Sequence, residues 1–166
     1  MTSCTQNIIT TEYELNIDAW AARMTEGRDV SHAIEHFRRV KNYTSQIMQG
    51  LEPELSNIHD VDCRKVLVAA ALLHDVFDHK YASAEETSDG LNEMCSFLRN
   101  EQKFTQIEVE AVISICTNVS YSKEKKGLLE KLDYPISLLR DIVSDADKLD
   151  AIGLAGIERC RLYSKV

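Results

Sequence analysis

The stretch VDCRKVLVAAALLHDVF at residues 61–77 decides the fold of this chain. Within it, Val66 to Leu73 form a run of eight apolar residues without a break. Such a run is typical of a buried strand or of a helix buried on nearly all sides, and the three consecutive alanines favour the helix. The run ends abruptly in His74 and Asp75. We therefore expect a central buried helix with two polar side chains at its end.

Apolar residues at spacings of three and four lie on both sides of this stretch and predict further helices. The first is expected at about 11–25, ending at Gly27, and the second from Asp29 or Ser31 to Gly50. Later helices are expected at about 83–99, 105–119, 123–131 and 136–151. The chain has only 2 prolines and 6 glycines, which leaves little turn chemistry for a many-stranded sheet. The sequence predicts an all-α helical bundle that forms a single domain over residues 1–166.

The composition and charge argue against a nucleic-acid partner. Hydrophobic residues make up 44% and charged residues 28% of the chain, as in an ordinary globular protein. A formal net charge of −8 without a basic stripe argues against nucleic acid as a partner. A small phosphorylated substrate remains compatible with this charge, because a bound metal can invert the local field.

The chain shows no signal for export or membrane insertion. No apolar stretch approaches about 18 residues, so neither a membrane span nor a membrane partner is expected. The amino terminus lacks a basic start followed by an apolar run. The 5 cysteines include no C-x-x-C pair, which favours reduced thiols. We expect a cytoplasmic location.

Histidines and aspartates form the candidate functional cluster: His36, the pair His74–Asp75 and the run DADKLD at 145–150. A buried imidazole or carboxylate without a partner costs several kcal/mol. One interpretation is structural, with His74 donating to a carbonyl and Asp75 capping a turn. The other is a metal held between helices by imidazoles and carboxylates. Such a donor set suits Mn²⁺, Fe²⁺, Co²⁺, Ni²⁺ or Zn²⁺ and leaves coordination positions for water and substrate.

Two other metal-binding interpretations fit less well. HAIEH at 32–36 matches the H-x-x-E-H helix of one metalloprotease class, but that class also needs a distant glutamate ligand and a second domain. DADKLD resembles the start of a calcium loop, but Leu149 stands where an oxygen ligand is needed and Asp150 where a glycine is needed.

The ordered motifs HFRRV at 36–40, LLHDVFDHKY at 72–81 and DADKLDAIGLAGIER at 145–159 resemble the HD-domain metal-dependent phosphohydrolase superfamily. NVSYS at 118–122 is also similar to a pattern of its small bacterial-type nucleotide (pyro)phosphohydrolases. The resemblance covers about residues 29–159, and the ordered set is specific although H-D alone is not. It implies a helical bundle with a metal site at its centre. The metal ligands carried over by position are His36, His74, Asp75 and Asp147.

The resemblance also implies a reaction. A divalent ion, Mn²⁺ foremost with Mg²⁺ as a further alternative, would acidify a water and polarise a phosphoryl oxygen. Asp78 lies one helical turn past Asp75 and is the candidate general acid or base. A salt bridge to Lys80 or a helix cap is its structural alternative.

Substrate binding is expected from Lys80 and Arg39, as cations for phosphate. Arg39 has the alternative of an ion pair with Asp75 or Asp150. Asp150 and His32 are expected to support the site by orienting ligands or touching substrate at its rim.

The expected function is hydrolysis of a small phosphorylated metabolite, with a nucleoside triphosphate pyrophosphohydrolase favoured. A nucleoside 5′-monophosphate phosphatase is the enzymatic alternative. A metal- and nucleotide-binding regulatory module without turnover is the alternative from another class. The family usually continues beyond the G-I-x-R motif, whereas this chain ends at RCRLYSKV, and a homodimer is a further expectation.

Overall fold

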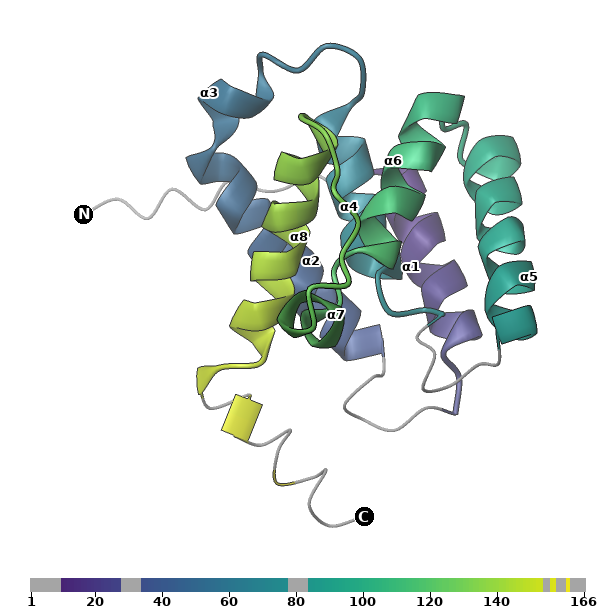
Figure 1. The fold of residues 1–166 in the computed structure, drawn as a ribbon. Coiled ribbons are helices and arrows are strands. Elements are labelled where there is room, and N and C mark those ends of the chain that lie inside the picture. The colour runs from purple at the N-terminus through teal and green to yellow at the C-terminus, as the bar shows by residue number, and fades with distance from the viewer. Residues whose placement is uncertain (1–9, 28–33, 78–83, 154–155, 158–160, 162–166) are drawn as a thin grey trace.

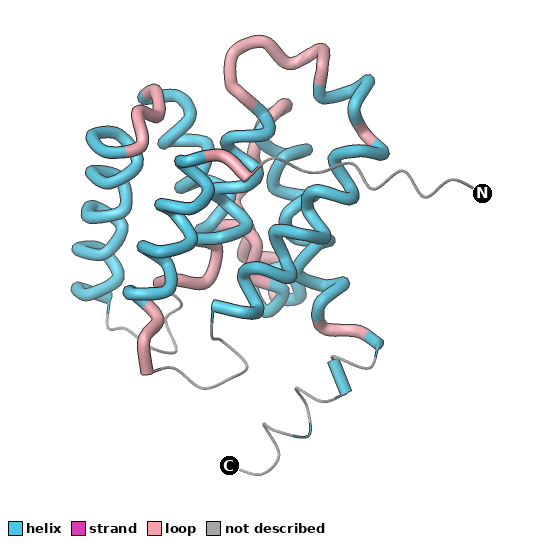
Figure 2. Tube along the Cα trace, turned by 180° about the vertical axis from the view of Figure 1, so that it is seen from behind, coloured by secondary structure: helices cyan, strands magenta, loops and turns pink. Residues whose placement is uncertain are grey.

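A computed structural model describes residues 10–27, 34–77, 84–153, 156–157 and 161. Within these residues the chain is helical, without a strand, as the tube in Figure 2 shows. The helices shown in Figure 1 are α1 (Glu12–Met24), α2 (Ile34–Gly50), α3 (Glu52–Leu55), α4 (Cys63–Leu73), α5 (Ala84–Ser96), the π-helical turn η2 (Phe97–Glu101), α6 (Gln106–Thr117), α7 (Tyr121–Lys125) and α8 (Ile136–Asp150). The predicted all-α fold is confirmed.

Helix α4 forms the centre of the bundle. Its first turn is capped by Asp62, whose Oδ1 accepts from the backbone N–H of Lys65 at 3.0 Å. Every residue from Val66 to Leu73 is at most 1% exposed. Helices α1, α2, α6 and α8 pack around α4, which explains why its sequence is apolar on all sides.

Helices α2 and α8 pack against each other and against α4. The side of α2 that faces this interface carries Phe37 and Val40, both fully buried, and α8 contributes Val143 and Ala146. Their burial sets the rotation of both helices about their axes. As a result, polar residues next to these apolar positions point at the end of α4.

The structure differs from the predicted helices in three places. The helix expected at 123–131 is α7, which ends at Lys125. Gly127 follows with a φ of +65°, which is not a right-handed helical value. No residue of α7 is buried, so no packing contact favours a longer helix. Helix α3 was not predicted, because the pattern indicated a stop at Gly50. The segment expected as one helix over 83–99 is α5 followed by the π-helical turn η2. The predicted start of the second helix lies outside the described residues.

The described helices include none that is long and apolar enough to cross a membrane. The described cysteines, Cys63, Cys95 and Cys116, are free thiols.

Candidate metal centre

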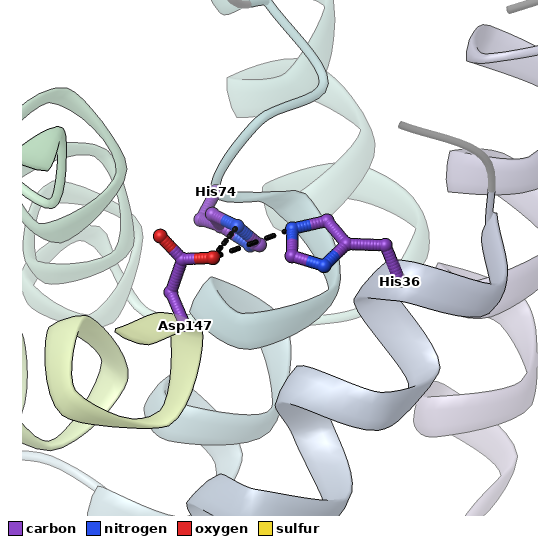
Figure 3. Close-up of side chains that lie close together, drawn as sticks. All are labelled: His36, His74 and Asp147. Atoms are coloured by element: carbon purple, nitrogen blue, oxygen red, sulfur yellow. Dashed lines mark ion pairs between the residues drawn. The ribbon is translucent and has the colours of Figure 1, made fainter. Parts of the chain in front are cut away.

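Three buried or half-buried side chains converge where α2, α4 and α8 meet. His36 lies in the first turn of α2, His74 caps the C-terminal end of α4, and Asp147 lies in the last turn of α8. One ligand atom from each lies within 4.8 Å of the others. Figure 3 shows both imidazole rings directed at the carboxylate of Asp147. Residues 111 positions apart in sequence thus form one cluster at the core of the bundle.

The orientation of His36 is fixed by Asp150, which is fully buried one turn beyond Asp147. Nδ1 of His36 lies 2.8 Å from Oδ2 of Asp150. A carboxylate can only accept, so Nδ1 carries the hydrogen and donates it. Nε2 therefore presents its lone pair to the cluster, 3.4 Å from Oδ1 of Asp147.

His74 is oriented in the same way by the backbone. Its Nδ1 lies 3.0 Å from the carbonyl oxygen of Ala71 and must donate to it, which again leaves the lone pair on Nε2. Nε2 lies 3.8 Å from a carboxylate oxygen of both Asp75 and Asp147. Among the described residues it is buried without a hydrogen-bond partner. A buried acceptor of this kind calls for a cation or a proton between it and the carboxylates.

The field at the cluster is negative and favours cations. Burial disfavours protonation of His74, but the carboxylates of Asp75 and Asp147 outweigh it and raise the pKa of His74 to about 9. Burial also disfavours ionisation of Asp150, but hydrogen bonds from His36 and Arg39 hold its pKa well below the usual range. The field that favours a proton on His74 also favours a divalent ion, which would displace that proton.

The donor set fits a divalent metal ion. Two ligands about 2.1 Å from one ion can lie at most about 4.2 Å apart. The distances from Oδ1 of Asp147 to Nε2 of His36 and His74, 3.4 and 3.8 Å, satisfy this limit. Two imidazole nitrogens and a carboxylate oxygen suit a first-row transition ion, and the group found among the described residues has three ligands rather than the closed four-ligand set of a structural zinc.

Comparison with known proteins agrees with this arrangement. The family model described as "HD domain" matches residues 33–152. The chain belongs to the HD domain family. Its all-α architecture and its His-His-Asp cluster, which could hold a metal ion, are consistent with an HD domain.

Individual relatives of this HD domain are distant. The protein L803 of Acanthamoeba polyphaga mimivirus is 28% identical over 153 residues, covering 85% of this chain and 56% of L803. YpgQ of Bacillus subtilis is 26% identical over 150 residues, covering 89% of this chain and 64% of YpgQ. The chain thus spans less than two thirds of the length of these relatives.

Two solved structures share the fold. A crystal structure of a Lactobacillus plantarum protein has a TM-score of 0.68 at 29% identity, covering 93% of this chain and 64% of the other. The crystal structure of Bacillus subtilis YpgQ in complex with ADP has a TM-score of 0.61 at 24% identity, covering 92% of this chain and 65% of the other.

Asp75, the fourth predicted metal ligand, lies beside the cluster. Asp75 is not part of the 4.8 Å group, although its Oδ2 lies 3.8 Å from Nε2 of His74. It follows the end of α4 and is 26% exposed, so it lies at the opening of the cluster. Its predicted role as a ligand stays a prediction.

Arg39 forms an ion pair with Asp150, one of the two alternatives that the sequence left open. Its Nε lies 2.6 Å from Oδ1 of Asp150, and its Nη2 lies 3.1 Å from Oδ2. The guanidinium thus supports the carboxylate that orients His36. Its expected contact with substrate phosphate stays a prediction. The other predicted residues, Asp78, Lys80 and His32, lie outside the described residues.

A cavity of about 180 Å³ adjoins the exposed side of the cluster. His74 and Asp75 line one part of it, and Phe77, Leu91 and Met94 provide apolar walls. Lys123, in α7, also lines this cavity. Neither the apolar walls nor Lys123 were predicted as functional. The only sequence signal near Lys123 is the motif NVSYS, which ends one residue before it.

Proposed function

We propose that this HD domain is a metal-dependent phosphohydrolase acting on a small phosphorylated metabolite, and that this metabolite is a nucleotide. The observation that carries the proposal is the convergence of His36, His74 and Asp147 beside a cavity open to a small molecule. A structural role alone would satisfy Nε2 of His74 with a hydrogen bond to or from a protein group. The described residues offer it none.

Two comparisons support the choice of substrate. The motifs of this chain resemble those of nucleotide (pyro)phosphohydrolases of the HD superfamily, and the structure of Bacillus subtilis YpgQ is of a complex with ADP. On this basis we propose cleavage of a nucleoside triphosphate between its α and β phosphates. Water then forms a new bond to the α phosphorus, and the bridging P–O bond breaks to release pyrophosphate.

We assign separate roles in this reaction to several residues of the chain. His36, His74 and Asp147 would hold the ion, with Asp75 as the proposed fourth ligand. When bound, a divalent ion supplies Lewis acidity toward a phosphoryl oxygen and lowers the pKa of water. Asp150 keeps the hydrogen of His36 on Nδ1, so that Nε2 stays available as a ligand. Asp78 is proposed to accept the proton of the attacking water, on the basis of its spacing from Asp75.

The test is a hydrolysis assay over nucleoside mono-, di- and triphosphates with added Mn²⁺, followed by product analysis. We expect metal-dependent release of pyrophosphate from a triphosphate, and its loss in Asp75→Ala. Orthophosphate released from a monophosphate would instead identify a nucleoside 5′-monophosphate phosphatase.

The regulatory alternative has its own signature in the same experiment. Tight metal and nucleotide binding without turnover on any substrate would refute the enzyme and identify a binding module. Metal content must therefore be measured on the same preparations, so that inactivity caused by lack of metal is recognised.

A further inference from the structure

The cavity beside the metal centre joins two features of opposite charge. It is lined by His74 and Asp75 of the cluster region and also by Lys123. Apolar side chains and the hydroxyl-bearing residues Thr117 and Ser120 complete its lining. A ligand that fills the cavity can therefore approach the metal cluster and the ammonium group of Lys123 at once.

The other described cations near the cluster are engaged by carboxylates. Arg39 is bound to Asp150. Lys148 lies 2.9 Å from Oε2 of Glu124 and 3.7 Å from Oδ1 of Asp145.

Lys123 differs from them, because its Nζ donates to a neutral acceptor, the carbonyl oxygen of Thr117, at 3.2 Å. No carboxylate among the described residues neutralises this ammonium group. Its charge is available for an anionic ligand.

The backbone of Lys123 is anchored, although its side chain is exposed. The α7 helix begins at Ser120, whose side chain accepts from the backbone N–H of Lys123. The next residue, Glu124, pairs with Lys148 of α8, which directly follows Asp147. Although this exposed pair adds little to stability, it ties α7 to the same turn of α8 that carries the cluster's aspartate. The pair thus links α7, which carries Lys123, to α8, which carries Asp147.

We propose that Lys123 binds a phosphoryl group of the substrate that the metal centre does not bind, so that the site selects substrates with at least two phosphoryl groups. The inference rests on the proposed function and deepens it by naming the substrate class. A divalent ion held by the cluster would balance the charge of one phosphoryl group near Asp75 and Asp147. A further phosphoryl group in the same acidic surroundings needs its own cation, and lysine binds phosphate as a point charge.

The test is equilibrium binding by calorimetry in the presence of Mn²⁺, with α,β-methylene-ADP, inorganic pyrophosphate and AMP as probes. Lys123→Met should weaken binding of the first two about tenfold or more, as expected for a lost hydrogen bond to a charged group. AMP should change less than twofold. Lys123→Arg should restore most of the affinity. The matched control is Lys126→Met, an exposed lysine immediately after α7 that does not line the cavity, and it should bind as the wild type does.

Each result has a definite meaning. Unchanged binding of α,β-methylene-ADP by Lys123→Met, equal weakening of AMP, or no binding of any probe by the wild type overturns the inference.

The proposed function fails separately, because none of these probes needs to be hydrolysed. A wild type that binds α,β-methylene-ADP through Lys123 but hydrolyses no nucleotide keeps the inference and refutes the enzyme. A wild type that hydrolyses triphosphates while Lys123→Met binds and reacts equally well keeps the enzyme and refutes the inference.

Discussion

Asp150→Asn is expected to weaken metal binding although Asp150 is not a predicted metal ligand. The carboxylate is fully buried and accepts from His36 Nδ1 at 2.8 Å and from Arg39 Nε and Nη2 at 2.6 and 3.1 Å. Asparagine replaces one of the two accepting oxygens by an NH₂ group that can only donate. The amide cannot accept from both side chains in the way that the carboxylate does.

The consequence depends on which partner loses its acceptor. If the NH₂ group takes the place of Oδ2, Arg39 Nη2 loses its acceptor, and the His36 imidazole must move its hydrogen from Nδ1 to Nε2, where it blocks the lone pair aimed at Asp147. If the NH₂ group faces Arg39, a guanidinium N–H loses its partner at a cost of about 1–3 kcal/mol. Loss of an orienting partner typically lowers metal affinity about 10- to 100-fold, which at saturating metal removes about 1.4–2.7 kcal/mol of metal-dependent stabilisation.

The measurement is Mn²⁺ titration by calorimetry together with urea unfolding with and without metal. The matched control is Asp18→Asn, because Asp18 makes the same two-oxygen pair with Arg38, the neighbour of Arg39 in α2, at 2.8 and 2.6 Å. That pair is largely exposed, so we expect less than about 1 kcal/mol and unchanged metal affinity. Wild-type Mn²⁺ affinity in a folded Asp150→Asn protein would refute the orienting role of Asp150.

Three further predictions concern the fold and the metal. Gly90→Ala should lower the free energy of unfolding by about 1–3 kcal/mol in urea titrations, because the new Cβ would clash with the ring of Phe77; Gly50→Ala, with open space around it, should not. Burial raises the pKa of Glu108, but hydrogen bonds from the Thr105 backbone and Lys65 outweigh it and lower the pKa. Its contribution is therefore fully present above the unfolded pKa of about 4.3 and is lost as the pH falls through the folded value. The stability difference between wild type and Glu108→Gln should shrink from pH 6 to pH 3, and a constant difference would contradict the lowered pKa. Finally, added Mn²⁺ should raise the Tm of the wild type but not that of His74→Ala, and an equal rise in both would show that the metal binds elsewhere.

The sequence predicts the centre of the fold well because one strong signal dominates there. The run from Val66 to Leu73 has no polar face, so α4 had to lie inside a bundle, and His74 had to lie at its buried end. The choice of Asp147 among the aspartates of DADKLD came from the family resemblance. In the structure Asp147 joins the cluster, while Asp150 turns to His36 and Arg39.

Other parts of the site depend on contacts that no local pattern encodes. The sequence left Asp75 and Asp150 as alternative ion-pair partners of Arg39, and the packing of α2 on α8 selects Asp150. The short α7 brings Lys123 to the cavity, yet it buries no residue and so leaves no periodic apolar signal. In the sequence, the apolar residues that line the cavity cannot be distinguished from ordinary core residues, because their role depends on neighbours that only the fold brings together.

The packing of α2 against α8 explains why orientation and coordination occur together. On α2, His36 and Arg39 are three residues apart, and on α8 Asp147 and Asp150 have the same spacing, so each pair lies on one helix face. When the two faces meet, His36 lies between both aspartates and Arg39 reaches the second.

The meeting of these faces depends on a small cluster with one residue from each helix of the site: Val40 of α2, Ala71 of α4 and Ala146 of α8, all fully buried. Ala71 also supplies the carbonyl that orients His74, and Ala146 precedes Asp147. Two alanines at this point allow the three backbones to approach closely, which larger side chains would prevent. The small core residues and the candidate metal ligands therefore form a single geometric unit, since a change in helix spacing would separate the nitrogen and oxygen donors that an ion would require.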